Sequence, residues 1–371
     1  MSNIAGYILQ NAQAQLGAIA MIDHSLARYQ KSRSRHLDQY GYSLKEVSYQ
    51  TFTNRFSRLA AGIRALDGIC PKDRIVICME NRPEYLDMLL ACWCAGLCVV
   101  PVNAKLHVKE ILHIVSDSAA RVVLLDEAYA EDLGQLFIEA HLHVHVLIAG
   151  SQDYANLYDA QPMACVDVQA DDLAWIFYTS GTTGRPKGAM LSHHNLLMMS
   201  LIYCADIEQV SPGDVQFHAA PLSHGAGLYS IPHLLGGGTQ VIFDGFDPQK
   251  MLDALDCFQN ITFFADLLKM NDALINTRIS QWSVLDSFDK ALITPFYKCS
   301  SGMKQILKIF ILTLQDPEIL IWDEPFDHLD TNAKNFLINQ YLMDKTLIYA
   351  SHSDTSLELS RSIKLMGSGK C

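Results

Sequence analysis

Residues 173–188 read LAWIFYTSGTTGRPKG, and this stretch decides the fold of the chain. Residues 173–178 form a compact apolar run, which predicts a buried strand. A turn rich in glycine and hydroxyl side chains follows directly. Gly181, Gly184 and Gly188 allow the backbone to adopt positive φ and to approach a ligand closely. The stretch therefore predicts a strand that ends in a ligand-binding turn.

The side chains of this turn favour a nucleotide phosphate as the ligand. Turn amides can surround phosphate oxygens, and Lys187 supplies a point charge for a β- or γ-phosphate. Hydroxyl donors are available from Thr179, Ser180, Thr182 and Thr183. A polar surface loop is the alternative, since Gly, Ser and Thr are common in loops, but this order of residues after an apolar strand favours phosphate. The spacing differs from GxxxxGK(S/T), so a generic P-loop NTPase is not indicated.

Upstream of the turn, β-rich runs alternate with stretches of helical period. The expected strands are residues 73–78, 98–101 and 121–125, and the expected helices are residues 47–66, 83–96 and 109–118. Such alternation indicates a mostly parallel sheet covered by helices on both faces. The predicted fold class is therefore α/β.

The composition bounds the classes of function. Half of the 371 residues are hydrophobic and 18% are charged, which predicts a large core in one large domain or two ordinary ones. The net charge of −12 argues against nucleic acid or an anionic membrane as a partner. The amino terminus shows no secretory signal. The apolar run 88–102 is shorter than the roughly twenty residues of a membrane span, so we expect a cytoplasmic protein.

Two groups of side chains raise the question of a metal site. Cys92, Cys94 and Cys98 lie in the apolar run without a nearby carboxylate or histidine, which favours small core residues over metal ligands. Residues 141–145 read HLHVH, and in a strand these three histidines would share one face. A partly exposed strand is favoured there, and a metal site is the alternative.

The turn YTSGTTGRPKG resembles the signature loop of the adenylate-forming superfamily, which includes acyl-CoA synthetases, luciferases and the adenylation domains of peptide synthetases. Three further segments resemble that family in the same order: residues 73–126, the histidine motif PLSHGAG at 221–227 and the strand region LGGGTQVI at 235–242. The resemblance covers roughly residues 15–264. The wording PLSHGAGL favours fatty acyl-CoA ligases.

The resemblance implies a two-step ligation with ATP and Mg²⁺. A carboxylate, such as a fatty acid, attacks the α-phosphate of ATP, and a thiol such as CoA then takes the acyl group. The residues that would hold the phosphates are Thr179, Ser180, Gly181, Thr182, Thr183, Gly184 and Lys187. His224 would lie beside the acyl pocket, with a helix-capping or packed histidine as the alternative.

The family's later motifs are not found after Phe264. These are an aromatic-Gly-x-Thr-Glu segment for adenine and metal, an aspartate for ribose and a lysine on a mobile domain. The sequence therefore predicts an incomplete acyl-CoA-synthetase-like domain of mixed parallel sheets with flanking helices over residues 1–264. Enzymatic activity stays open at this level.

The remaining residues carry a second set of nucleotide motifs. Residues 297–305 read YKCSSGMKQ, residues 319–330 read ILIWDEPFDHLD and residues 346–352 read TLIYASH. An apolar strand that ends in Asp323 and Glu324 is a Walker B arrangement, in which the aspartate holds Mg²⁺ and the glutamate orients water. A second strand would bring His352 to the γ-phosphate.

This stretch resembles the second half of an ABC-transporter ATPase domain. Ser300 and Gly302 stand in its signature segment, where Ser301 and Met303 depart from the family's pattern. The Walker A loop of that family is not found, and residues 367–371, GSGKC, are interpreted as a plain turn. The prediction for residues 265–371 is a partial RecA-like ABC ATPase core.

Three hypotheses follow for the function. The first is an adenylation fragment that binds ATP or pyrophosphate weakly and does not turn over. The second is an ABC-type ATPase subunit with a membrane transporter as partner. The third is a non-functional fusion product, because strands lost from both sheets would leave open edges and exposed apolar surface.

Overall fold

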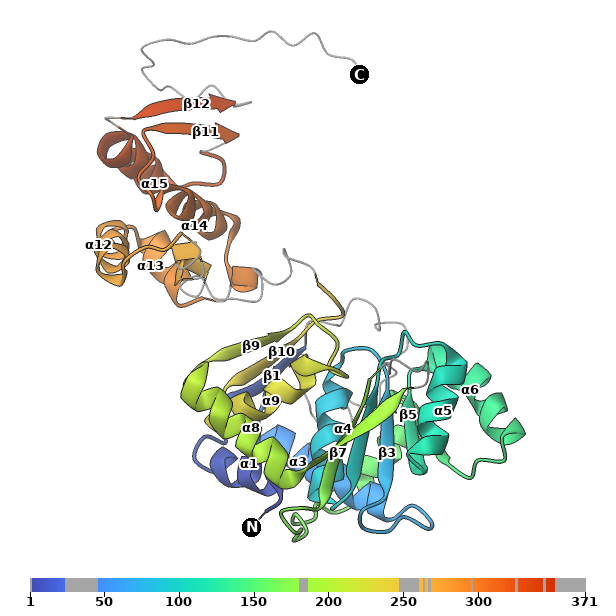
Figure 1. Cartoon of the computed structure of the whole chain (residues 1–371). Helices are drawn as coiled ribbons and strands as arrows, with labels where there is room; N and C mark the ends of the chain where they lie inside the picture. The colour runs from blue at the N-terminus through green and yellow to red at the C-terminus, as the bar shows by residue number, and fades with distance from the viewer. Residues whose placement is uncertain are drawn as a thin grey trace, which may run out of the picture. The chain divides into compact units, whose positions relative to one another are not determined.

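The computed structural model describes residues 2–23, 46–179, 186–246, 260–262, 264–265, 268–294, 296–323, 326–342 and 345–350. The chain divides into two compact units, Met1–Met251 and Leu252–Cys371, called here the first and the second unit (Figure 1). The domain boundary that the sequence predicts between residues 264 and 265 stays a prediction.

The larger sheet of the first unit has six strands in the order β6-β5-β3-β4-β7-β8. Neighbouring strands are parallel except for β8, which is antiparallel to β7. The strands are β3 Arg74–Cys78, β4 Cys98–Val102, β5 Ala120–Leu125, β6 His145–Ile148, β7 Leu173–Thr179 and β8 Lys187–Ser192. The prediction of a mostly parallel sheet in an α/β fold is confirmed.

Helices cover both faces of this sheet because successive residues of a strand point to opposite faces. Ile75 and Ile77 of β3 belong to one apolar cluster with residues of α3 and α4, whereas Val76 and Cys78 belong to another with residues of α5 and α6. The helices are α3 Tyr49–Arg64, α4 Pro83–Cys94, α5 Val108–Asp117 and α6 Glu127–Glu139. They lie where the sequence predicts helices between residues 47 and 118, and α6 continues the alternation.

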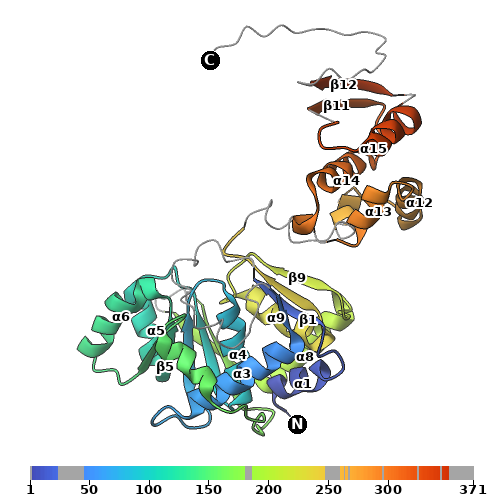
Figure 2. The same ribbon diagram turned by 180° about the vertical axis from the view of Figure 1, so that it is seen from behind.

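The smaller sheet of the first unit has four strands in the order β2-β1-β10-β9. Strands β1 and β9 are parallel to β10, and β2 is antiparallel to β1. The strands are β1 Ile19–Asp23, β2 Glu46–Ser48, β9 Val215–His218 and β10 Thr239–Ile242. Among the described residues of the unit, the further α-helices are α1 Ile4–Ala12, α7 Gln152–Asn156, α8 His193–Asp206 and α9 Gly225–Gly236. Met21 and Ile242 of this sheet share an apolar cluster with Ile75 and Val99 of the larger sheet, so one core joins the two sheets (Figure 2).

Helix α4 is buried along its whole length. Its residues Cys92 and Cys94, and Cys98 on β4, are buried free thiols. Burial raises the pKa of the Cys92 thiol well above its usual value. The interpretation of these three cysteines as core residues is confirmed.

The expected strand over the three histidines is shorter than predicted. Strand β6 begins at His145, and His141 adopts positive φ in the turn before it. His145 Nε2 donates a hydrogen bond to the Asp67 carbonyl at 2.9 Å. The prediction that the three histidines share one face of a strand is therefore wrong.

The second unit has its own core of aromatic side chains. Trp282 packs against Phe310 and Phe336, with ring centroids 5.1 and 5.4 Å apart. Two parallel strands lie against this core, and both were expected from the sequence. The elements in the described part of this unit are α12 Asp272–Trp282, α13 Asp286–Leu292, a 3-10 turn Phe296–Lys298, α14 Ser301–Thr313, β11 Ile319–Asp323, α15 Thr331–Phe336, a π-helical turn Leu337–Tyr341 and β12 Thr346–Ala350.

Across the described part of both units, every helix is too short or too polar to cross a membrane.

Asp87→Ala is expected to lower the free energy of unfolding of the first unit by about 3–5 kcal/mol. Arg55 of α3 and Asp87 of α4 form a buried ion pair, and the Tyr158 hydroxyl donates to Asp87 Oδ2 at 3.2 Å. The single substitution removes the carboxylate that pairs with the buried Arg55 guanidinium. The double variant Arg55→Met/Asp87→Leu removes both charges and should lose much less stability in urea denaturation. Equal losses in the two variants would contradict this account.

Acid is expected to destabilise the first unit through two histidines. Burial lowers the pKa of His193 and of His218 to about 4, from an ordinary value of 6.5. Between pH 6.5 and about 4 these two imidazoles therefore bind more protons in the unfolded chain than in the folded one, and their contribution to the free energy of unfolding falls as pH falls. Burial raises the pKa of the Asp87 carboxyl to about 6, and that group contributes with the opposite sign. Each histidine contributes up to about 1.4 kcal/mol per pH unit.

Urea unfolding across this pH range checks the account. His193→Gln should reduce the slope of unfolding free energy against pH by up to one bound proton. Replacing the exposed His143 by glutamine is the control for the loss of an imidazole from the surface. An unaltered slope in His193→Gln would refute the role of that ring.

Candidate functional site

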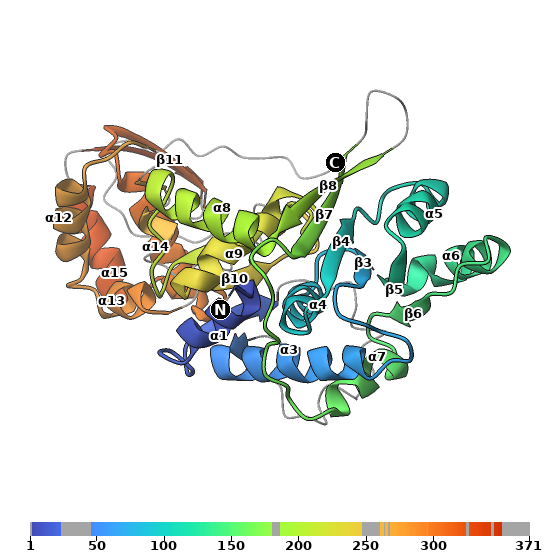
Figure 3. The same ribbon diagram turned by 60° about the horizontal axis from the view of Figure 1, so that its bottom comes forward.

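Strands β7 and β8 form a hairpin that carries the predicted phosphate turn. Thr179 ends β7 and pairs with Lys187, which begins β8, so the two predicted ligands face each other across the antiparallel pair (Figure 3). Both residues are exposed. The predicted ligands Ser180, Gly181, Thr182, Thr183 and Gly184 lie outside the described residues. The structure thus places the two ends of the turn side by side.

Gly188 follows Lys187, and its role differs from the expected one. It is not among the described glycines with positive φ. A Cβ at this position would lie 2.7 Å from Ile176 Cγ2 and 3.1 Å from the Tyr178 ring. The prediction of positive φ at Gly188 is therefore wrong. Glycine is favoured at this position because the Ile176 and Tyr178 side chains lie over its backbone and leave no space for a Cβ.

Tyr178 fixes the base of the hairpin to α5. Its hydroxyl donates a hydrogen bond to Asp117 Oδ2 at 2.6 Å. Burial, followed by the effect of the Asp117 carboxylate, raises the pKa of Tyr178, so the phenol stays protonated. The strand that leads into the turn is therefore held on the face that α5 covers.

His224 lies beside this hairpin. It occupies the position before α9, and its side chain makes no capping hydrogen bond. Its Nδ1 lies 2.9 Å from Ser223 Oγ, and its ring packs edge-to-face on Phe177 of β7 with a centroid distance of 5.8 Å. The helix-capping part of the alternative is therefore wrong, whereas the contact with Phe177 agrees with its other part, a packed histidine. This contact places His224 beside the strand that leads into the predicted phosphate turn.

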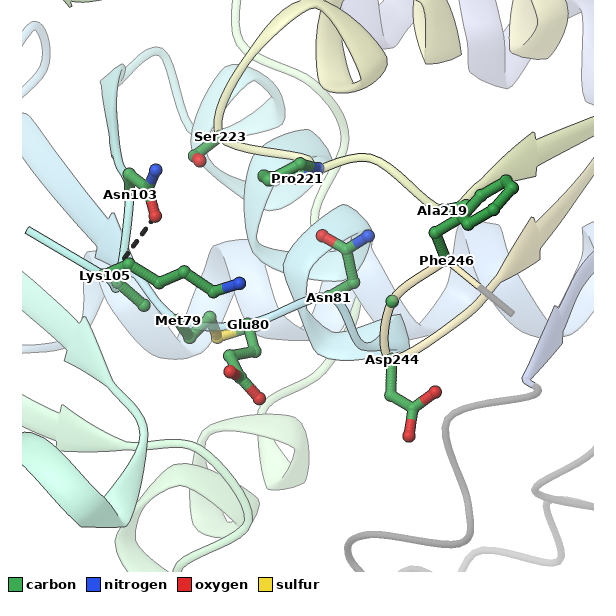
Figure 4. A pocket seen from close by; sticks show the side chains of 12 residues that line it. Met79, Glu80, Asn81, Asn103, Lys105, Ala219, Pro221, Ser223, Asp244 and Phe246 are labelled. Carbon is green, nitrogen blue, oxygen red and sulfur yellow. Dashed lines mark hydrogen bonds between the residues drawn. The ribbon is translucent and has the colours of Figure 1, made fainter. Parts of the chain in front are cut away.

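A pocket of about 390 Å³ is lined in part by Ser223, which precedes His224 in the chain (Figure 4). Its walls follow the carboxyl ends of β3, β4, β9 and β10. Ligands of α/β proteins commonly bind at this edge of a parallel sheet. The polar side chains that line it are Glu80, Asn81, Asn103, Lys105, Ser223 and Asp244. Figure 4 shows the Lys105 side chain extending into the pocket towards Asn81.

None of these pocket residues was predicted as a site residue from the sequence, although Ser223 lies within the PLSHGAG motif. A signal was present, because Glu80 and Asn81 follow one predicted strand, and Asn103 and Lys105 follow another. Parallel strands bring such positions to one edge of a sheet. The contribution of the smaller sheet could not be found in this way, since its strands were not assigned to a second sheet.

The second unit brings some of its predicted residues together. Ser300 caps α14 by accepting a hydrogen bond from Met303 N at 3.2 Å. Gly302 lies against the 326–330 segment, where a Cβ would be 2.6 Å from the His328 carbonyl oxygen. A second pocket of about 410 Å³ is lined by Ser300, Gly302 and Asp330. Asp323 ends β11, and Glu324, His352 and the side chain of Asp323 lie outside the described residues.

The first unit is thus a mixed α/β protein in which His224 packs on the β7–β8 hairpin and its neighbour Ser223 lines a pocket at the ends of parallel strands. A family model described as AMP-binding enzyme matches residues 12–291, and the chain belongs to the AMP-binding enzyme family. A second model, described as an AAA domain, matches residues 249–358.

The similar curated proteins include CoA ligases and peptide synthetases. The chain is 38% identical over 212 residues to a feruloyl-CoA synthase of an Amycolatopsis species. The aligned region covers 57% of this chain and 41% of that protein. It is 27% identical over 205 residues to the 3-hydroxybenzoate–CoA/4-hydroxybenzoate–CoA ligase of Thauera aromatica, covering 53% of this chain and 38% of that protein. The chain therefore spans about two-fifths of the length of these two CoA ligases.

Solved structures agree with the fold. The ATP-bound MatB from Rhodopseudomonas palustris aligns with a TM-score of 0.57 and 28% identity, over 68% of this chain and 47% of that chain. The N-terminal domain of FACL13 from Mycobacterium tuberculosis aligns with a TM-score of 0.57 and 23% identity, over 68% of this chain and 59% of that chain, and so supports the fold alone.

Gly188→Ala is expected to destabilise the first unit by about 1–3 kcal/mol, the usual cost of overpacking a core. The added methyl would collide with Ile176 Cγ2. Gly134→Ala is the matched control, because Gly134 lies within α6 and a Cβ there meets nothing within 4 Å. That variant should gain up to about 1 kcal/mol. Urea denaturation measures the free energy of unfolding of both variants. An unchanged value in Gly188→Ala would show that the Ile176 and Tyr178 side chains do not lie over this backbone.

Proposed function

We propose that the first unit binds ATP and an organic carboxylate for acyl-adenylate formation, with CoA as the thiol that takes the acyl group. The observation that carries the proposal is the pairing of Thr179 with Lys187 beside His224. This pairing brings a lysine and a hydroxyl together at the end of the hairpin that leads into the turn. Family membership and the similar CoA ligases support the same chemistry.

In this proposal the chain's own groups bind and orient the reactants. Lys187 and the hydroxyls and amides of residues 179–184 bind the β- and γ-phosphates, where positive charge and backbone N–H groups stabilise a developing phosphoryl charge. His224 lies beside the carboxylate. Mg²⁺ would neutralise phosphate charge when bound, and in proteins it is usually held by one or two carboxylates together with the phosphates.

We further propose that these 371 residues bind ATP or pyrophosphate weakly and do not complete the ligation. The sequence after Phe264 contains no motif that resembles the family's adenine, ribose or lysine segments. The second unit matches a different family model over residues 249–358. The cytoplasmic location expected from the sequence stays a prediction.

The class of carboxylate is proposed from the relatives. The feruloyl-CoA synthase and the hydroxybenzoate–CoA ligase are named for aromatic acids, whereas the wording PLSHGAGL favours fatty acids. We propose an aromatic carboxylate, and a panel of ferulate, 4-hydroxybenzoate and a medium-chain fatty acid separates the two classes.

Lys187→Ala is expected to weaken ATP binding about tenfold to a hundredfold, because a hydrogen bond to a charged group contributes about 1.5–3 kcal/mol. Isothermal titration calorimetry on the full chain with Mg-ATP measures the effect. Lys109→Ala is the control, since Lys109 is an exposed lysine at the start of α5. Equal affinities of wild type and Lys187→Ala would refute the phosphate site. Pyrophosphate–ATP exchange above background that is lost in Lys187→Ala would refute the proposed lack of turnover and support the site.

A second candidate function is nucleotide binding by the second unit as an ATPase-like module. It is favoured by the match to an AAA-domain family and by the pocket between Ser300, Gly302 and Asp330. In the ABC hypothesis such a signature segment acts on ATP held by another subunit, with Asp323, Glu324 and His352 as the metal-binding and catalytic residues. The comparisons give no support to a membrane-transporter partner.

A further inference from the structure

The segment after β3 is held firmly to its own sheet by buried charges. Glu80 N donates a hydrogen bond to Asp126 Oδ2 at 2.7 Å, and Arg82 Nη1 lies 3.2 Å from Asp126 Oδ1. Arg82 also pairs with Glu84 through two contacts of 3.1 Å. Arg82, Glu84 and Asp126 are buried. The backbone on both sides of Asn81 is therefore fixed relative to the six-stranded sheet.

The Asn81 side chain leaves this sheet and binds the backbone of the other one. Its Nδ2 donates to the carbonyl oxygens of His218 at 3.1 Å and Ala220 at 2.8 Å. Its Oδ1 accepts from Leu222 N at 2.8 Å. Asn81 is buried, so these three bonds are made where water does not compete freely. One amide thus holds the whole segment 218–222.

That segment leads directly to His224. Ser223 and His224 follow Leu222, Ser223 Oγ lies 2.9 Å from His224 Nδ1, and the imidazole rests on Phe177 of the six-stranded sheet. The segment 218–224 is therefore attached to the larger sheet at two places, through the Asn81 side chain and through the contact of His224 with Phe177. Asn81 thereby fixes how far His224 stands from the β7–β8 hairpin.

Only asparagine fits this set of partners. An aspartate would present a carboxylate to two carbonyl oxygens, and an alanine would leave three backbone groups without a side-chain partner. Asn81 and Ser223 both line the 390 Å³ pocket, so water in that pocket can hydrate the freed groups. The loss of Asn81 should therefore displace the segment while the surrounding core stays folded.

We propose that Asn81 is a positioning residue that sets the place of His224 and of one pocket wall relative to the phosphate turn. The consequence for ligand binding rests on the proposed function. The effect of Asn81 on the position of His224 does not depend on the proposed function. The position of His224 and the binding of ligands are therefore tested separately.

The first test reads the position of His224 without any ligand. In a histidine-labelled full chain, ¹H–¹³C spectra report the ring-current shift that Phe177 imposes on the His224 imidazole. Phe177→Leu gives the signal without that ring. Asn81→Ala and Asn81→Asp should move the His224 signal towards the Phe177→Leu position. Asn103→Ala is the matched control: Asn103 lines the same pocket, and its Oδ1 accepts from Lys105 N within the same turn.

Two outcomes of this test overturn the proposal. One is a wild-type His224 signal in both Asn81 variants. The other is an equal displacement in Asn103→Ala. If neither Asn81 variant folds, amide hydrogen exchange in the wild type decides, because the Leu222 N–H must be protected by Asn81 Oδ1. Exchange of that amide at the rate of an unstructured peptide overturns the proposal as well.

The second test measures ligands on the same variants. ATP should bind Asn81→Ala with a Kd within twofold of wild type, because the phosphate turn is untouched. A non-hydrolysable feruloyl-adenylate analogue should bind about tenfold more weakly, because its acyl end lies beside His224. Absence of ATP binding by the wild type would refute the proposed function and leave the spectroscopic result standing. Equal loss of both ligands would refute the positioning role.

Discussion

The first unit depends on the burial of α4 between two sheets. Every residue of this helix is buried, including Glu84 and Asp87. A buried carboxylate costs several kcal/mol unless it is paired, and both carboxylates meet an arginine: Asp87 meets Arg55 of α3 and Glu84 meets Arg82. Because these ion pairs neutralise the two buried carboxylates, α4 can lie inside the apolar core that contacts both sheets.

This constraint also explains where the candidate site lies. With α4 in the shared core, the carboxyl ends of β3 and β4 and those of β9 and β10 line one pocket. The hairpin β7–β8 extends from the larger sheet, and His224 comes from the segment that follows the smaller one. Residues far apart in the sequence are therefore brought together by the packing of the two sheets, and Asn81 is the described side chain that bonds one sheet edge to the other at this place.

Local patterns sufficed for much of the fold. The apolar run 173–178, the strands at 74–78, 98–102 and 120–125, and the pair β11 and β12 could all be predicted, because a buried strand is a short apolar run between turns. The pattern failed at residues 141–145, where alternation alone suggested a strand although His141 adopts positive φ. Alternation of polar and apolar residues also occurs in turns, and backbone dihedrals are not encoded by it.

The site was predictable in its chemistry and less so in its geometry. Lys187 and Thr179 were found from the turn that they flank. The role of Gly188 was missed because it is steric. The pairing of β7 with β8 brings the side chains of Ile176 and Tyr178 over the Gly188 backbone, and they leave no space for a Cβ. Asn81 and Leu222 are 141 positions apart, and no periodicity connects them. Contacts of this kind follow from the tertiary fold and become visible only when both sheets are placed.

In the described part of the second unit the sheet has two strands, and one of its faces is largely exposed. Leu320 and Trp322 of β11 pack on the aromatic core, but the alternate residues of the same strands do not: Ile321 is 76% exposed and its partner Ile348 is 55% exposed. Parallel strands usually bury both faces, and two strands alone are marginally stable. In the first unit the corresponding positions of β3 face helices on both sides. The apolar sequence of β11 and β12 is therefore typical of a sheet covered on both faces, and an exposed apolar face of this kind favours association with other surfaces.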